Sequence, residues 1–164
     1  GRMAVPTFAI AEIPANNPGG MINNQVEKQA EFANGQATTY NKELETLMKG
    51  YKFEYEFTDP ALTDEDLISK GYMYAMYKLH TSGKEIKRLL DYQVSDDDET
   101  YTTVRLANGK PALRYIPADA PVYKYYIKHL KTGNVYLGKN WDADEGWQDA
   151  LKNCLYGISQ EKTR

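Results

Sequence analysis

Extended apolar runs joined by short, glycine-containing turns dominate the second half of the chain, and they constrain the fold more than any other feature. Such turns occur at Gly83, Gly109 and Gly133. Glycine supplies the positive φ angle that tight hairpin turns need, and Asn108-Gly109 is the strongest short signal for a hairpin. The pattern predicts three antiparallel hairpins, at residues 72–92, 100–116 and 122–137.

The first of these hairpins has an alternative. Met73, Met76 and Leu79 also fit one face of a helix, and residues 85–92 are compatible with a helix too. We expect strands here, with helix as the competing interpretation. Before this region, residues 51–57 alternate aromatic and charged side chains, which predicts one more half-buried strand.

The first half of the chain carries an apolar stripe with helical spacing. From Val26 onwards, apolar residues recur at alternating steps of four and three, which predicts one long helix that ends near Gly50. The stripe contains Val26, Ala30, Ala33, Ala37, Tyr40, Leu44 and Leu47. We expect this face to lie across a sheet. The alternative is a homodimer formed through residues 26–47.

Two shorter helices are also expected. Thr63 and the acids that follow it mark the start of a helix from Asp64 to about Lys70, because acids favour the positive end of the helix dipole. Near the C-terminus, Asp142 is the predicted N-cap, with Glu145 as its partner in a capping box. The helix that follows has one apolar face, predicted to cover the sheet. This face contains Trp147, Leu151, Cys154, Leu155 and Ile158.

The first 22 residues are rich in proline, glycine and asparagine. We expect residues 1–22 to be a flexible leader or a remnant of cloning, and residues 23–160 to form a single α+β domain. Ala9-Ile10-Ala11 has the small-x-small form of a signal-peptidase site, although the apolar stretch before it is too short for an intact secretory signal. These features slightly favour an exported bacterial protein, periplasmic or secreted.

Charge is strongly segregated along the sequence. Residues 100–141 carry seven basic side chains, one acid and six of the fourteen tyrosines, so this window is +6 in a chain whose net charge is −3. The remaining residues therefore sum to −9. A negative net charge argues against general binding to nucleic acid or to acidic membranes. No apolar run is long enough to cross a bilayer, so membrane insertion is not expected.

Within this window, residues 122–130 predict a strand with two unlike faces. The odd-numbered residues are expected to face the core. The even-numbered face places two lysines around an aromatic ring, an arrangement that can stack bases or sugars and hold an anion. The ordinary alternative is a solvated strand face. The predicted binding residues are Lys124, Tyr126, Lys128, Arg105 and Arg114.

Residue types with catalytic or metal-binding chemistry are few. His80, His129 and Cys154 could together supply three zinc ligands, but an ordinary structural role is the preferred interpretation for each. Cys154 lies on the apolar face of the closing helix, which disfavours a nucleophilic thiol. Residues 140–144 partly match a calcium loop but lack its central glycine and closing glutamate. No metal site and no cofactor are expected.

The predicted fold class is α+β. It consists of an antiparallel sheet of about five to seven strands, built from hairpins and packed by a long N-terminal helix and a short C-terminal helix. The leading hypothesis is a non-enzymatic binding or interaction protein that uses the basic, tyrosine-rich sheet face or the long helix, with another protein as its partner. One alternative is a single-strand nucleic-acid binder whose affinity falls steeply with salt. The other is a small hydrolase with two carboxylates in one pocket.

Overall fold

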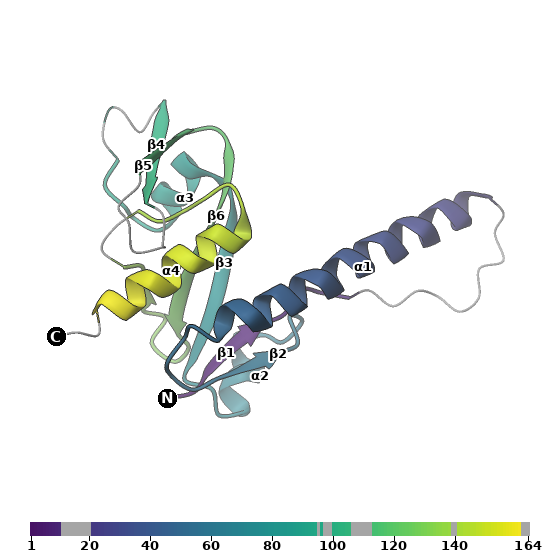
Figure 1. The fold of residues 1–164 in the computed structure, drawn as a ribbon. Coiled ribbons are helices and arrows are strands. Elements are labelled where there is room, and N and C mark those ends of the chain that lie inside the picture. The colour runs from purple at the N-terminus through teal and green to yellow at the C-terminus, as the bar shows by residue number, and fades with distance from the viewer. Residues whose placement is uncertain (11–20, 95, 97–99, 106–112, 139–140, 162–164) are drawn as a thin grey trace.

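The computed structural model of the protein describes residues 1–10, 21–94, 96, 100–105, 113–138 and 141–161. Two layers of helices and loops enclose a central sheet, and one long helix extends away from it (Figure 1). The elements are β1 (Met3–Pro6), α1 (Met21–Met48), β2 (Tyr55–Thr58), α2 (Asp64–Ser69), β3 (Tyr74–Ser82), α3 (Gly83–Leu89), β4 (Tyr101–Arg105), β5 (Leu113–Pro117), β6 (Pro121–His129), β7 (Val135–Tyr136) and α4 (Trp147–Glu161).

The sheet confirms the predicted α+β class and is mixed rather than wholly antiparallel. Its five strands have the order β2-β1-β3-β6-β7, and β4 and β5 form a separate two-stranded sheet. Strand β1 runs parallel to both β2 and β3, whereas β6 runs antiparallel to both of its neighbours, β3 and β7. Strand β2 covers the second half of the strand predicted at residues 51–57.

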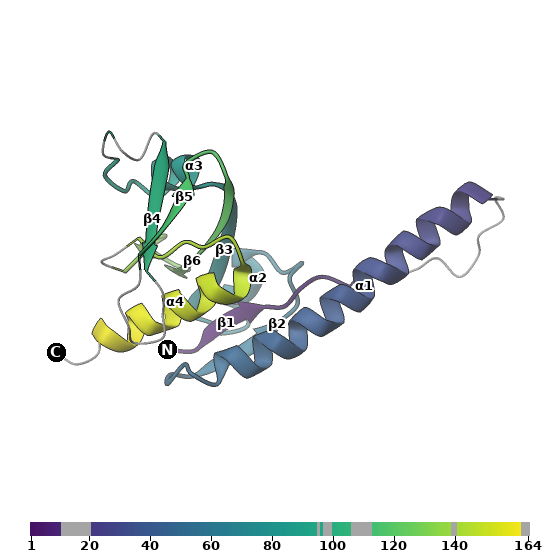
Figure 2. The same ribbon diagram turned by 45° about the horizontal axis from the view of Figure 1, so that its top comes forward.

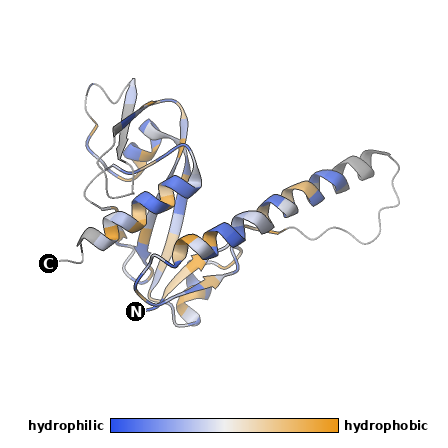
Figure 3. Ribbon diagram, in the orientation of Figure 1, coloured by the Kyte–Doolittle hydropathy of each residue, from blue (hydrophilic) through white to orange (hydrophobic). Residues whose placement is uncertain are grey.

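The structure differs from the predicted flexible leader at its first residues. Met3–Pro6 form strand β1 in the interior of the sheet, and the side chain of Met3 is 0% exposed. Met3, Ala4 and Val5 are all apolar because both faces of β1 are covered, as is usual for parallel strands. Strand β1 is coloured as hydrophobic in Figure 3. The predicted leader residues 11–20 lie outside the described part of the chain.

Two of the three predicted hairpins are confirmed. Strands β4 and β5 pair from Tyr101 opposite Pro117, while the Asn108-Gly109 turn lies outside the described residues. Strands β6 and β7 are joined by a turn in which Gly133 has φ +77°. The Gly133 N–H donates to the carbonyl of His129 at 2.8 Å. Glycine is suited to this turn because it adopts a positive φ angle without steric cost.

The prediction of a hairpin at residues 72–92 is wrong. Its first arm is strand β3, but the chain then enters helix α3 instead of turning back. The Ser82 hydroxyl accepts a hydrogen bond from the Glu85 N–H at 3.2 Å, which caps this helix, and Ile86 is fully buried. Strand β3 pairs instead with β6 along its whole length, from Tyr74 opposite His129 to Ser82 opposite Pro121.

Helices α1 and α4 cover one face of the sheet (Figure 2). Both helices confirm the sequence prediction, and α4 buries Trp147 and Leu151 as expected. The predicted N-cap is wrong, because α4 begins at Trp147 and the side chain of Asp142 pairs with Lys124. The core on this face contains Met3, Val5, Leu44, Met48, Met76, Tyr125, Trp147, Ala150, Leu151, Cys154 and Leu155.

The opposite face of the sheet is covered as well. Leu67 of α2 packs against Ala4 and Ala75 near one end of the strands. Ile86 of α3 and Ile116 of β5 meet Val122 near the other end. Both faces of β6 are therefore largely shielded from solvent, which decides where its lysines lie.

Candidate interaction surface

The predicted basic face of β6 is not a solvated surface. Lys124 is 0% exposed, and its ammonium reaches three oxygens. It donates to the carbonyls of Tyr125 at 2.8 Å and Leu137 at 3.2 Å, and it forms an ion pair with Asp142 Oδ1 at 2.7 Å. Burial raises the pKa of Asp142, and the charge of Lys124 opposes that rise. Lys124 is thus part of the interior and inaccessible to a ligand.

The second lysine of this face is also engaged. Lys128 Nζ lies 2.7 Å from Asp64 Oδ2, at the first residue of α2, and the hydroxyl of Tyr77 donates to the same carboxylate. The hydrogen bond from Lys128 holds the pKa of Asp64 below its usual value, and Tyr77 adds to the effect. Tyr126 lies between the two lysines, half-buried against the ring of Tyr77.

Arg114 does not extend this face. Arg114 contacts Asp144 at 3.2 Å and Glu145 at 3.4 Å. Arg105 ends strand β4, and its side chain lies outside the described part of the chain. The structure therefore does not gather the five predicted residues into one exposed patch. Acids from distant segments, at positions 64, 142 and 144, neutralise the basic strands within the fold.

The residues considered for metal or nucleophilic chemistry are dispersed. His80 pairs with Tyr123 and His129 with Tyr74, at opposite ends of the β3–β6 ladder, so the two histidines are about 20 Å apart. Burial raises the pKa of the Cys154 thiol to about 12, which disfavours the thiolate. Among the described residues, no three His, Cys, Asp or Glu side chains form a metal-binding group.

The base of α1 adjoins a hollow of about 470 Å³. The Asn41 amide holds the chain beside it, because Asn41 Oδ1 accepts from the Phe8 N–H at 2.7 Å and Asn41 Nδ2 donates to the Phe8 carbonyl at 3.2 Å. The lining residues are Thr7, Phe8, Ala9, Ile10, Asn41, Asp59, Pro60 and Ala61. Asp59 is the single carboxyl in this lining, whereas the hydrolase hypothesis requires two.

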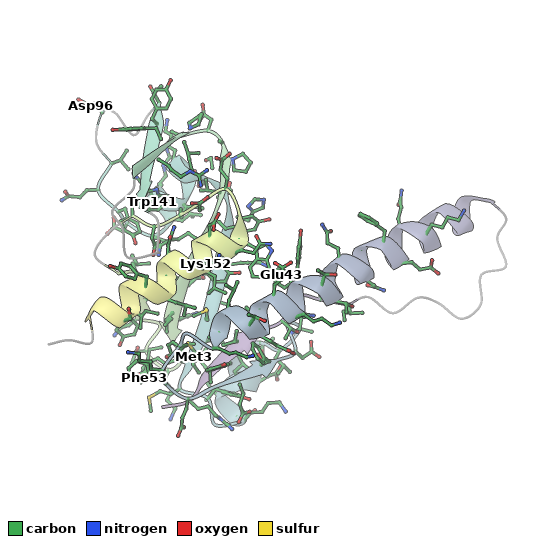
Figure 4. All side chains as sticks on the ribbon, viewed as in Figure 1. Met3, Glu43, Phe53, Asp96, Trp141 and Lys152 are labelled. Atoms are coloured by element: carbon green, nitrogen blue, oxygen red, sulfur yellow. The ribbon has the colours of Figure 1, made fainter. Side chains whose placement is uncertain are left out.

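The N-terminal part of α1 extends beyond the rest of the molecule (Figures 1 and 2). The apolar stripe is buried at Ala37, which is 7% exposed, and at Leu44, and it is partly buried at Tyr40 and Leu47. Towards the N-terminus the same stripe continues to Ala33, which is exposed, and the neighbouring Phe32 is 75% exposed. Figure 4 shows side chains of the N-terminal part of α1 directed into solvent, whereas Glu43 lies where α1 meets the body. We call residues 21–36 the arm.

One lysine on the sheet differs from those of the basic window. Lys78 of β3 shares its face with Met76 and lies opposite Tyr125, and its ammonium lies 3.7 Å from the centre of the Phe8 ring. No carboxylate among the described residues lies within ion-pair distance of it. Sequence analysis missed this residue, because one lysine in a strand carries no signal of its own.

Comparison with protein-family models, with curated proteins and with solved structures found no match for this chain. Within the described residues, no helix combines the length and the apolar character that crossing a bilayer requires.

Proposed function

We propose that this protein is a non-enzymatic interaction module, and that the arm of α1 is the element that docks onto another protein. The observation that carries the proposal is the continuation of one apolar stripe past the point where the helix leaves the body. Ala37 faces the core, and Ala33, one turn earlier on the same stripe, faces solvent.

The energetics of isolated helices support this proposal. Helices shorter than about 12–15 residues are marginal in water, and most helical stability in proteins comes from packing of an apolar face. The arm has 16 residues, which is only just above this range, and Gly35 in its last turn lowers its intrinsic helix stability. A partner that covers the stripe at Ala33 would supply the packing that the body provides from Ala37 onwards.

The alternatives have less support. A homodimer through the whole of residues 26–47 would require Ala37 and Leu44, whose side chains are buried in the core, so a second copy could use the arm alone. Single-strand nucleic-acid binding would require Lys124 and Lys128, and both are in internal ion pairs. The arm therefore supports the proposal better than the basic strand does.

Photo-crosslinking from the arm tests the proposal. An Ala33→p-benzoylphenylalanine variant, irradiated in the cells that produce the protein, should yield a discrete covalent adduct. The matched control places the same photoreactive side chain at Lys131, an exposed residue in the β6–β7 turn. Adducts of equal yield from both positions, or none from position 33, would reject the arm as the docking element. An adduct of twice the chain mass would identify the partner as a second copy.

A further inference from the structure

Several basic side chains on or beside the strands have carboxylate partners within the protein. Arg2 pairs with Glu56 at 2.6 Å, and Arg114 pairs with Asp144 at 3.2 Å. The internal pairs of Lys124 and Lys128 follow the same rule, at 2.7 Å each. Lys78 departs from it, since no acid in the described part of the chain reaches its ammonium.

The surroundings of Lys78 do not replace the acidic partner that it lacks. Lys78 is exposed as a residue, but its ammonium lies over the Phe8 ring, and the partial loss of water around the ammonium lowers the pKa of Lys78 to about 8. Glu43, where α1 meets the body, accepts a hydrogen bond from Gln148 at 2.9 Å. On the strands, Lys78 lies opposite Tyr125 and two residues before His80, which stacks on Tyr123.

Lys78 also lies at the base of the arm. The Phe8 ring beneath its ammonium packs against Tyr40 of α1 at 5.2 Å and Trp147 of α4 at 4.8 Å. Asn41 of α1 holds the Phe8 backbone. Ala33 lies eight residues before Asn41, about 12 Å along the helix axis. A partner helix of three to four turns along the arm is therefore long enough to reach Lys78.

We infer that the partner of the arm carries a carboxylate that pairs with Lys78, so that the docking segment is an acidic amphipathic helix of another protein. This inference rests on the proposed function and specifies its partner. The apolar side of the segment covers the stripe at Ala33, and an aspartate or glutamate at its end meets the ammonium over Phe8. Charge complementarity selects an acid, because a partner that covers the Lys78 ammonium removes water from it, and a carboxylate supplies the counter-charge that the covered ammonium then needs.

Two synthetic peptides of equal length and identical leucine spacing test this inference. One carries glutamate at its polar positions and the other carries glutamine. Each is titrated into the ¹⁵N-labelled full chain at low ionic strength while amide shifts are followed by NMR. We expect the glutamate peptide to bind roughly tenfold more tightly and to shift the amides of Lys78 and His80. We expect Lys78→Gln to remove most of that difference.

The matched control is Lys131→Gln, which removes the same charge from an exposed turn. Equal affinity for the two peptides, no binding of either peptide, or equal losses in the two variants would overturn the inference. The two proposals fail separately in this experiment. Shifts confined to residues 28–36 with no effect of Lys78→Gln would support docking on the arm and reject an acidic partner for Lys78. Shifts confined to Lys78 and its neighbours would reject the arm.

Discussion

Lys124 and Asp142 form a buried ion pair whose two members cannot be removed singly without cost. Lys124→Ala leaves the buried carboxylate of Asp142 without its counter-charge, and we expect a loss of about 3–5 kcal/mol in the free energy of unfolding. The double variant Lys124→Met, Asp142→Leu replaces both charges with apolar groups, and it should recover most of that loss. Urea denaturation measures all three proteins.

The control for this pair is Lys131→Ala, an exposed lysine whose loss should change stability by less than about 0.5 kcal/mol. A Lys124→Ala variant as stable as this control would mean that the ion pair is not buried as described. A double variant no more stable than Lys124→Ala would mean that the pair does more than neutralise its own charges.

The ion pair between Lys128 and Asp64 should contribute a pH-dependent stability. The pKa of Asp64 is lowered in the folded state, so its contribution is present above the unfolded value near pH 4 and is lost as pH falls through the folded value. Asp64→Asn should cost about 1 kcal/mol at pH 7. The difference from the unmodified chain should shrink below about pH 4, as measured by thermal unfolding. A difference that is constant from pH 7 to pH 2 would contradict this assignment.

Residue patterns predicted which side chains share a face but not which face meets water. The alternation along β6 correctly separated Tyr125, which is buried in the core, from the lysine face. The lysine face of β6 is covered because Asp64 and Asp142, which lie more than ten residues away in sequence, pair with its lysines. No local pattern contains that information, since a lysine looks the same in sequence whether water or a carboxylate solvates it.

At the scale of elements, one half of α1 packs against the body and the other half extends from it. Matched substitutions in the two halves test this difference. Ala37→Glu places a charge in the core and should cost about 3 kcal/mol or more. Ala33→Glu, one turn earlier on the same stripe, should change stability by less than about 0.5 kcal/mol. Chemical denaturation of both variants gives the comparison. Similar losses at the two positions would place the arm against the body.

Helices and hairpins with strong local signals were predictable, and elements that depend on distant partners were not. Helix α2 begins at Thr63, whose hydroxyl accepts from the Asp66 N–H while the Asp66 carboxylate accepts from the Thr63 N–H, so its start is encoded within four residues. Strand β1 has four residues, and its parallel neighbours lie about 50 and 70 positions later in the chain. Parallel pairing of this kind leaves no turn signal to read.

At the scale of the whole molecule, β1 joins two parts of the sheet that make no other strand pairing with each other. Its neighbour β2 connects to α1, and its other neighbour β3 begins the antiparallel half. Removing β1 would open the sheet at that point and would expose the core around Met48 and Leu67. The first residues of the chain therefore hold together the base of the arm and the rest of the fold.

A chain that lacks residues 1–6 should consequently lose cooperative unfolding, because apolar surface on both sheet faces is left uncovered. Far-ultraviolet circular dichroism during heating and binding of a hydrophobic dye measure this loss. The control is Arg2→Ala in the full chain, which removes the contacts of Arg2 with Glu56, the Lys70 carbonyl and the Tyr72 ring and should keep a single sharp transition. A shortened chain that unfolds as sharply as the control would show that these residues are dispensable, as the predicted leader requires.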